Sequence, residues 1–327
     1  MSKYLQNKVA EHALTLPVAS LITALVWLSA GLLVHKWWIQ LVFLVISAYL
    51  MVELSNNNAL LRVRSRMVTS TFLILSSCLP SMFGGLQGGI VCFCFLAAFL
   101  LMFQTYQDKA AAGLLFYAFL FIGISSLLEV QTLLFVPLLW LLCLTQLQSL
   151  SIRTWAASLL GLITPYWFIL PWIIYQQDFG SLTTHFAQLG HFGQSFGYHL
   201  LPHGLQLFFL LIVVLFVLSS IHFRSRSFED RFRLRQLYGF FSWTGIAAAL
   251  FLLVQPQLYD PLIRIIVICV SPFVAHFFTL TSSRLTNIIF IVSIVLVAAV
   301  MGFNLYEFLS VPNTEVSPTP WSGLLTF

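Results

Sequence analysis

The chain has 327 residues, of which 60% are hydrophobic and only 8% are charged, and its formal net charge is +5. About a quarter of the residues in an ordinary soluble domain are charged, so this composition excludes a water-soluble fold. Backbone groups in lipid find partners only inside helices or closed barrels, and the alternating pattern of a barrel strand is absent. We therefore expect an all-α, polytopic integral membrane helical bundle.

About eleven apolar runs follow one another along the chain, each near the length at which a helix crosses a bilayer. Several are close to the lower limit of that length. The region 110–149 is either two short helices broken at Ser125 and Ser126 or one re-entrant hairpin. The expected spans are 14–34, 37–54, 67–84, 88–106, 110–127, 131–149, 154–175, 205–222, 238–255, 261–281 and 285–308.

The basic residues predict the orientation, because Lys and Arg accumulate on cytoplasmic loops. With the amino terminus inside and the carboxyl end outside, Lys36 alone falls in an outer loop and Arg264 falls within the tenth span. The same bias accounts for the positive net charge, so no nucleic acid is expected as a partner. The remaining basic residues are all expected in cytoplasmic segments: Lys3, Lys8, Arg62, Arg64, Arg66, Lys109, Arg153, Arg224, Arg226, Arg231, Arg233, Arg235 and Arg284.

Residues 1–309 are expected to form one transmembrane domain, with an outer loop at about 177–204 and a flexible outer tail at 310–327. The first apolar run follows two lysines, as in a signal peptide, but it is long enough to span and has no clear cleavage site, so we interpret it as a retained helix. The cysteines lie inside apolar spans at no metal-binding spacing, and no glycine-rich nucleotide loop is present. We therefore expect neither a metal nor a cofactor.

Two of the few polar groups on the expected outer side, Asp260 and Arg264, are four residues apart at the start of the tenth span. On a helix this spacing places both on one face with the acid nearer the amino end, the favourable order for an ion pair. A cation at this depth needs a partner or an aqueous cavity, which makes both residues candidates for substrate binding. The alternative is a purely structural pair.

The outer loop carries apolar residues at steps of three and four, which indicates short interfacial helices. Its histidines, among them His185 and His199, would lie near membrane lipids and near any lipid-linked substrate, so we include these two as candidate binding residues. His199 and His203 share the four-residue spacing of two metal ligands on a helix. However, Pro202 lies between them and no glutamate accompanies them, so interfacial histidines are favoured over a metal site.

Residues 127–172 contain a span, a short basic turn at 151–153 and a glycine-containing span that ends in proline, and the long outer loop follows them. Residues 260–278 form a late span with an arginine near its outer end. Both segments resemble the multi-spanning envelope glycosyltransferases of the GT-C type and the O-antigen polymerase-like proteins. The resemblance implies an inner-membrane protein of bacterial cell-envelope biogenesis.

The same resemblance implies a transferase that acts at the outer face on sugars linked to a polyprenyl phosphate. In those families a carboxylate of the first outer loop acts as general base or binds metal. Here that loop, around Lys36, contains no acid. The base would then be Asp178, Glu129 or a loop histidine, and Arg264 would hold the phosphate of the donor.

Two further function classes stay open beside an enzyme. One is a noncatalytic membrane subunit or scaffold of an envelope assembly, which would have a membrane protein partner. The other is a transporter, which usually places broken segments at mid-membrane in two related halves. No internal repeat is present in the sequence, so a transporter is the least favoured of the three.

Overall fold

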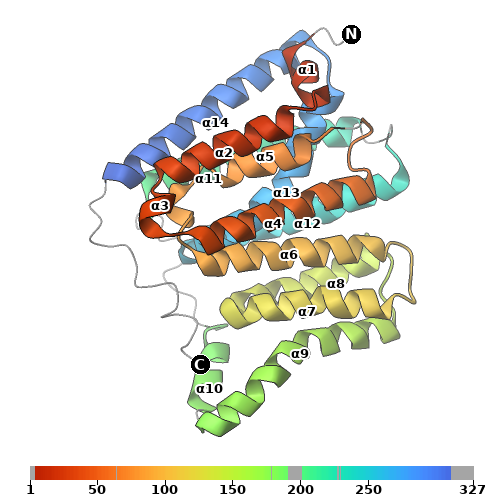
Figure 1. Ribbon diagram of the computed structural model, residues 1–327. Coiled ribbons are helices and arrows are strands. Elements are labelled where there is room, and N and C mark those ends of the chain that lie inside the picture. The colour runs from red at the N-terminus through yellow and green to blue at the C-terminus, as the bar shows by residue number, and fades with distance from the viewer. Residues whose placement is uncertain are drawn as a thin grey trace.

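The computed structural model describes residues 4–63, 65–177, 179–190, 201–226, 228 and 230–310. Every regular element among these residues is helical, which confirms the expected all-α class. The long helices lie side by side, with α14 near one edge of the molecule and α9 near the other (Figure 1). The elements are α1 (Leu5–Glu11), α2 (Thr15–Ser29), α3 (Leu32–His35), α4 (Trp38–Asn58), α5 (Met67–Ser76), η1 (Pro80–Met82), α6 (Leu86–Gln104), α7 (Ala112–Leu128), η2 (Val130–Phe135), α8 (Val136–Thr145), α9 (Ile152–Gln176), α10 (Phe179–Ala187), α11 (His203–Arg226), α12 (Phe232–Val254), η5 (Pro256–Leu258), α13 (Tyr259–Leu280) and α14 (Arg284–Ser310).

Within the described part of the chain, seven helices are long and apolar enough to cross a membrane: α4, α6, α9, α11, α12, α13 with η5, and α14. The pair α1 and α2 bends by 91° at its break and raises the number to 8 if it is counted as one span. The runs expected at 67–84 and 131–149 instead contain the shorter helices α5 and α8, each next to a 3-10 turn. Pro80 begins one of these turns, because proline suits the first position of a helix but has no backbone N–H to donate within the preceding helix.

The region 110–149 forms two separate helices. The first, α7, runs through Ser125 and Ser126 and ends at Leu128, after which Glu129 adopts an extended conformation. The break therefore lies at Glu129 and not at the serines, since the Ser126 hydroxyl donates a hydrogen bond of 2.7 Å to the carbonyl of Gly123 within the helix. The end of α8 returns to the start of α7, where the amide of Gln107 donates to the carbonyl of Leu147 at 2.8 Å.

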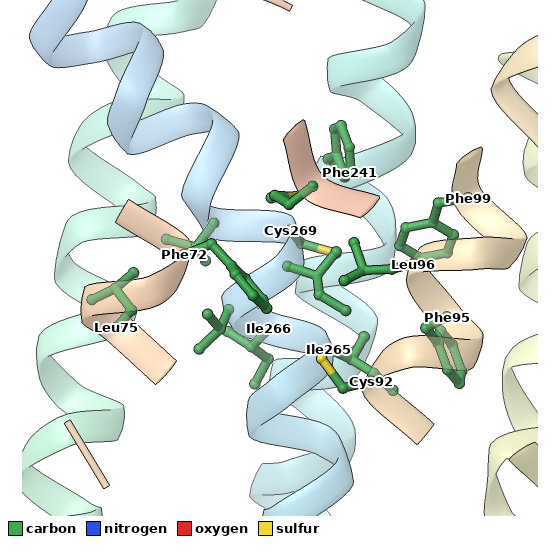
Figure 2. Packing of buried hydrophobic residues seen from close by; sticks show 14 of the residues in the cluster. Phe72, Leu75, Cys92, Phe95, Leu96, Phe99, Phe241, Ile265, Ile266 and Cys269 are labelled. Carbon is green, nitrogen blue, oxygen red and sulfur yellow. The ribbon is translucent and has the colours of Figure 1, made fainter. Parts of the chain in front are cut away.

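The buried centre of the bundle is α13, in which 18 of 22 residues are buried. It packs against α5, α6, α11 and α12. Figure 2 shows this core, in which Ile265, Ile266 and Cys269 of α13 meet aromatic and aliphatic side chains of α5, α6 and α12. By contrast, only three of the 27 residues of α14 are buried, so most of its apolar surface faces outward, as expected of a helix that uses lipid as its solvent.

Close packing of α7 against α9 depends on two glycines. A β-carbon on Gly123 would stand 2.8 Å from the carbonyl oxygen of Leu162, and one on Gly161 would collide with the carbonyl oxygen of Phe116. Small residues allow two helix backbones to approach in this way. The backbone of α7 at Phe116 therefore approaches Gly161 of α9, and the backbone of α9 at Leu162 approaches Gly123 of α7.

Hydrogen bonds between loops define two ends of the bundle. At one end, which we call the basic end, they join the starts or ends of α1, α5, α6, α12, α13 and α14. The bonds run from Ser65 to Ala10, from Gln6 to Thr281 and to Asn287, from Arg62 to Asp230 and from Arg233 to Phe103. At the opposite end they join η1, α4, α11, α13 and α14 through Arg264 to Met82, Gln40 to Gly84 and Gly204 to Glu307. Of the outer loop expected at 177–204, the structure describes α10 but not residues 191–200, and residues 311–327 of the expected tail also lie outside the description.

Candidate functional site

The candidate site is built around the ion pair of Asp260 and Arg264 in the first turns of α13. Nε of Arg264 donates to Oδ1 of Asp260 at 2.6 Å, so the pair expected from the four-residue spacing is present. Nη2 of Arg264 also donates to the carbonyl of Met82 at 2.5 Å. The guanidinium thus ties the central helix to the turn between α5 and α6.

Two glycines of α6 make room for the carboxylate of this pair. A β-carbon on Gly85 would lie 2.5 Å from Oδ2 of Asp260, and one on Gly88 would collide with the same group. Gly85 is the residue that precedes the first turn of α6. The amino end of a helix carries a positive partial charge, so the position of Asp260 beside it is electrostatically favourable.

The cavities that adjoin the pair, as formed by the residues that the structure describes, are small. The cavity that Arg264 lines, together with Trp27 and Phe83, has a volume of about 20 Å³. The crevice beside Glu129 and Pro261 measures about 10 Å³. A cavity of this size holds about one water molecule. In this conformation neither space accepts a sugar or a lipid head group.

Glu129 lies between α7 and η2, outside both helices, and is half-buried. Burial, and secondarily the negative charge of Asp260, raise the pKa of its carboxyl to about 7. The two acids are therefore close enough to interact electrostatically, although they belong to different helical segments. A carboxyl with this pKa can take up or release a proton near neutral pH, which is the property required of a general base.

His185 lies apart from the ion pair, on α10. It is buried, and its Nε2 forms a hydrogen bond of 3.0 Å with the carbonyl of Ser126. The hydroxyl of the same serine lies 2.8 Å from the hydroxyl of Tyr166, so α10 is fastened to α7 and α9. Burial lowers the pKa of His185, which favours the neutral imidazole. These contacts hold the imidazole of His185 against α7.

The predicted site residues are thus only partly brought together. Asp260, Arg264 and Glu129 lie at the end of the bundle opposite the basic end, and Asp260 and Arg264 are in direct contact. Asp178 and His199 lie outside the described residues. Among the residues described, no group of three or more His, Cys, Asp or Glu side chains could hold a metal ion.

A second buried polar cluster, at the basic end, was not expected from the sequence. Asp230, whose side chain is fully buried, accepts from Nε of Arg62 at 2.6 Å and lies 3.3 Å from Nε2 of His276. Tyr238 packs its ring against His276 and donates to the carbonyls of Leu60 and Pro272 at 3.1 and 3.2 Å. The signal that the sequence offers is an acidic dipeptide inside an arginine-rich loop.

No family model, curated protein or solved structure matches this chain. The chemistry of the site therefore has to be inferred from its own geometry. The ion pair supplies a fixed charge arrangement that joins α13, α6 and η1, and Glu129 supplies a group that titrates near neutral pH. At the basic end, the buried cluster around Asp230 connects the loop before α5, the loop before α12 and α13 through polar contacts.

Proposed function

We propose that the chain crosses a bacterial inner membrane eleven times, with the basic end in the cytoplasm. The proposal is supported by the loop contacts, which join the expected cytoplasmic segments at one end and the expected outer segments at the other. Short apolar helices such as α5 and α8 run between the same two ends with the help of adjoining turns. Lys and Arg at the basic end satisfy the positive-inside rule.

Labelling of single cysteines in intact cells tests this orientation. All five native cysteines are buried, so they give little background. We expect Gln188→Cys, on the exposed surface after α10, to react with a membrane-impermeant maleimide from outside. Arg226→Cys, at the exposed end of α11, is expected to react only after the membrane is opened. Labelling of both from the same side would refute the proposed orientation.

We further propose that the protein is a noncatalytic membrane subunit or scaffold of an envelope assembly. The observation that carries this proposal is that Arg264 already donates two hydrogen bonds within the protein. Its Nε donates to Asp260, and its Nη2 donates to the carbonyl of Met82. A phosphate-binding arginine of an enzyme needs donors that face a substrate cavity. Here the adjoining cavity has a volume of about 20 Å³.

An enzyme that acts on lipid-linked sugars is the second candidate, and the observation that favours it concerns Glu129. This carboxyl has a pKa of about 7 and lies near the ion pair, as a general base beside a phosphate-binding arginine would. In this proposal Glu129 takes the proton of the sugar acceptor, and Arg264 exchanges Met82 for the phosphate of a polyprenyl donor. That exchange requires η1 to move away from α13.

Complementation of a strain that lacks the protein separates the two candidates. If the protein is a scaffold, the degree of complementation should follow the amount of folded protein in the membrane. This should hold for Glu129→Gln, for Arg264→Gln and for the double variant Asp260→Asn with Arg264→Gln. For an enzyme, Glu129→Gln accumulates to the level of the native protein and fails to complement. The scaffold proposal is rejected by that second result.

A further inference from the structure

An apolar crevice of about 170 Å³ lies between α14 and the neighbouring helices of the bundle. Its walls come from α2, α5, α11, α13 and α14, and they include Met67 and Thr71 of α5 and Phe278 of α13. An apolar cavity of about 150 Å³ is large enough to take up a small hydrocarbon such as benzene. Because the crevice is open on one side and its lining is almost entirely apolar, a hydrocarbon is the matching occupant.

The outer wall of the crevice is the least enclosed of the long helices. Among the 27 residues of α14, all of which the structure describes, only Phe290, Ser293 and Asn304 are buried. The helix is instead attached at its ends, where it meets α1, α11 and η1. Unfilled space beside α14 would forfeit dispersion contacts along the wall, so a lipid chain that enters it gains contacts at little conformational cost to the protein.

The length of the crevice suits one leaflet. Along α14 it extends from Phe290 to Met301, which at about 1.5 Å per residue corresponds to roughly 16 Å. The hydrocarbon core of a bilayer is about 30 Å thick, so each leaflet contributes about 15 Å. The near end of the crevice at Phe290 lies about 9 Å along α14 from Arg284, so an acyl chain that starts at the basic end would enter the crevice and fill its nearer part.

Three exposed cations lie at the basic end of the same helices: Lys8 on α1, Arg66 before α5 and Arg284 at the start of α14. The short helix α1 holds these elements together. The amide of Gln6 donates to Oδ1 of Asn287 on α14 at 3.3 Å. The hydroxyl of Ser65, next to Arg66, donates to the carbonyl of Ala10 at 2.5 Å. A phosphate at this end would meet cations from three separate elements.

We propose that this crevice is a binding site for an anionic phospholipid of the leaflet at the basic end. One acyl chain lies between α14 and α5, and Lys8, Arg66 and Arg284 attract the phosphate. Complementarity of charge at the end and of apolar surface along the wall together select a lipid, since a peptide would bring polar backbone groups into a dry crevice. The site is independent of the ion pair at the opposite end.

Native mass spectrometry of the full chain, purified in detergent and offered phosphatidylglycerol or phosphatidylcholine, tests the proposal. We expect the native protein to retain phosphatidylglycerol several-fold better. Ala298→Phe, which fills the crevice from α14, is expected to abolish most of this retention. The matched control is Ala299→Phe, which adds the same ring to the exposed neighbour outside the crevice lining and is expected to retain lipid normally.

Separate variants test whether the cations at the basic end bind the head group of the lipid. Arg284→Gln is expected to weaken phosphatidylglycerol retention roughly five-fold, the effect of one cation near an anionic surface, and to leave phosphatidylcholine unaffected. Arg153→Gln, at the start of α9, removes an exposed cation far from the crevice and serves as control. Thr71→Leu fills the crevice from α5 and replaces Ala298→Phe if that variant loses its helical circular dichroism. Equal retention by the crevice variants and their controls, or equal retention of the two lipids, would overturn the proposal.

Discussion

The α-carbon of Gly88 on α6 lies so close to Asp260 on α13 that any β-carbon at this position would collide with the carboxylate. A glycine and a charged residue more than 170 positions later in the chain thus depend on each other. The contact brings the start of α6 against the central helix and leaves the carboxylate free to accept from Arg264. It also makes the ion pair sensitive to a single methyl group.

Gly88→Ala should therefore destabilise the protein. Overpacking of a tight contact typically lowers the free energy of unfolding by about 1–3 kcal/mol. Gly89→Ala is the matched control, because its new β-carbon would lie 3.7 Å from the nearest atom, Cβ of Phe43, which is ordinary contact. Alanine also favours a helix over glycine by up to about 1 kcal/mol, so the control should be neutral or stabilised. Thermal unfolding in detergent measures both, and equal losses would contradict the collision.

Gly161→Ala tests the packing of α7 against α9 in the same way. The new methyl group would collide with the carbonyl of Phe116, so the helices must separate, and we expect a loss of about 1–3 kcal/mol. Gly302→Ala on α14 has nothing within 4 Å of its new β-carbon and should not destabilise. Chemical unfolding followed by circular dichroism compares the two, and an unchanged Gly161→Ala variant would refute the close approach.

The Asp230 cluster predicts a specific sensitivity to acid. Burial alone would raise the pKa of Asp230, but the hydrogen bonds and charges of His276 and Arg62 outweigh it and lower the pKa. A carboxyl with a lowered pKa in the folded state stabilises the protein above its unfolded value of 3.8, and this contribution is lost as the pH falls further. Asp230→Asn should lose this dependence below pH 3.8, while Asp108→Asn, at an exposed acid, should retain it. Unfolding temperatures of the native protein and the two variants, measured at several pH values around and below 3.8, test this prediction.

Glu129 predicts the opposite sign in a different range. Its pKa rises from 4.5 to about 7 because burial, and then Asp260, disfavour its charge. The native protein should thus be fully stabilised below pH 4.5 and lose stability as the pH rises through about 7. Glu129→Gln removes the loss, which amounts to at most about 3 kcal/mol and to less for a partly exposed group. The variant should melt at a higher temperature than the native protein at about pH 8 and at a similar temperature near pH 4.5. Parallel pH profiles of the two proteins would contradict the raised pKa.

The sequence by itself determined the class of the protein and several of its local contacts. Partition of a side chain into lipid depends on its own chemistry, so the apolar runs predicted an all-helical chain, and seven helices of the described residues are long and apolar enough to cross a membrane. The pair of Asp260 and Arg264 was also predictable, because residues four apart on a helix share one face.

Only the tertiary structure decided which helices meet, and with them the character of the site. Whether Arg264 faces a substrate cavity or the carbonyl of Met82 depends on the turn after α5, and the sequence spacing within α13 contains no information about that turn. The same holds for the space beside α14 and for the burial of Asp230 between Arg62 and His276. Helices in lipid associate through shape and polar contacts between residues far apart in the chain, and no local pattern encodes those contacts.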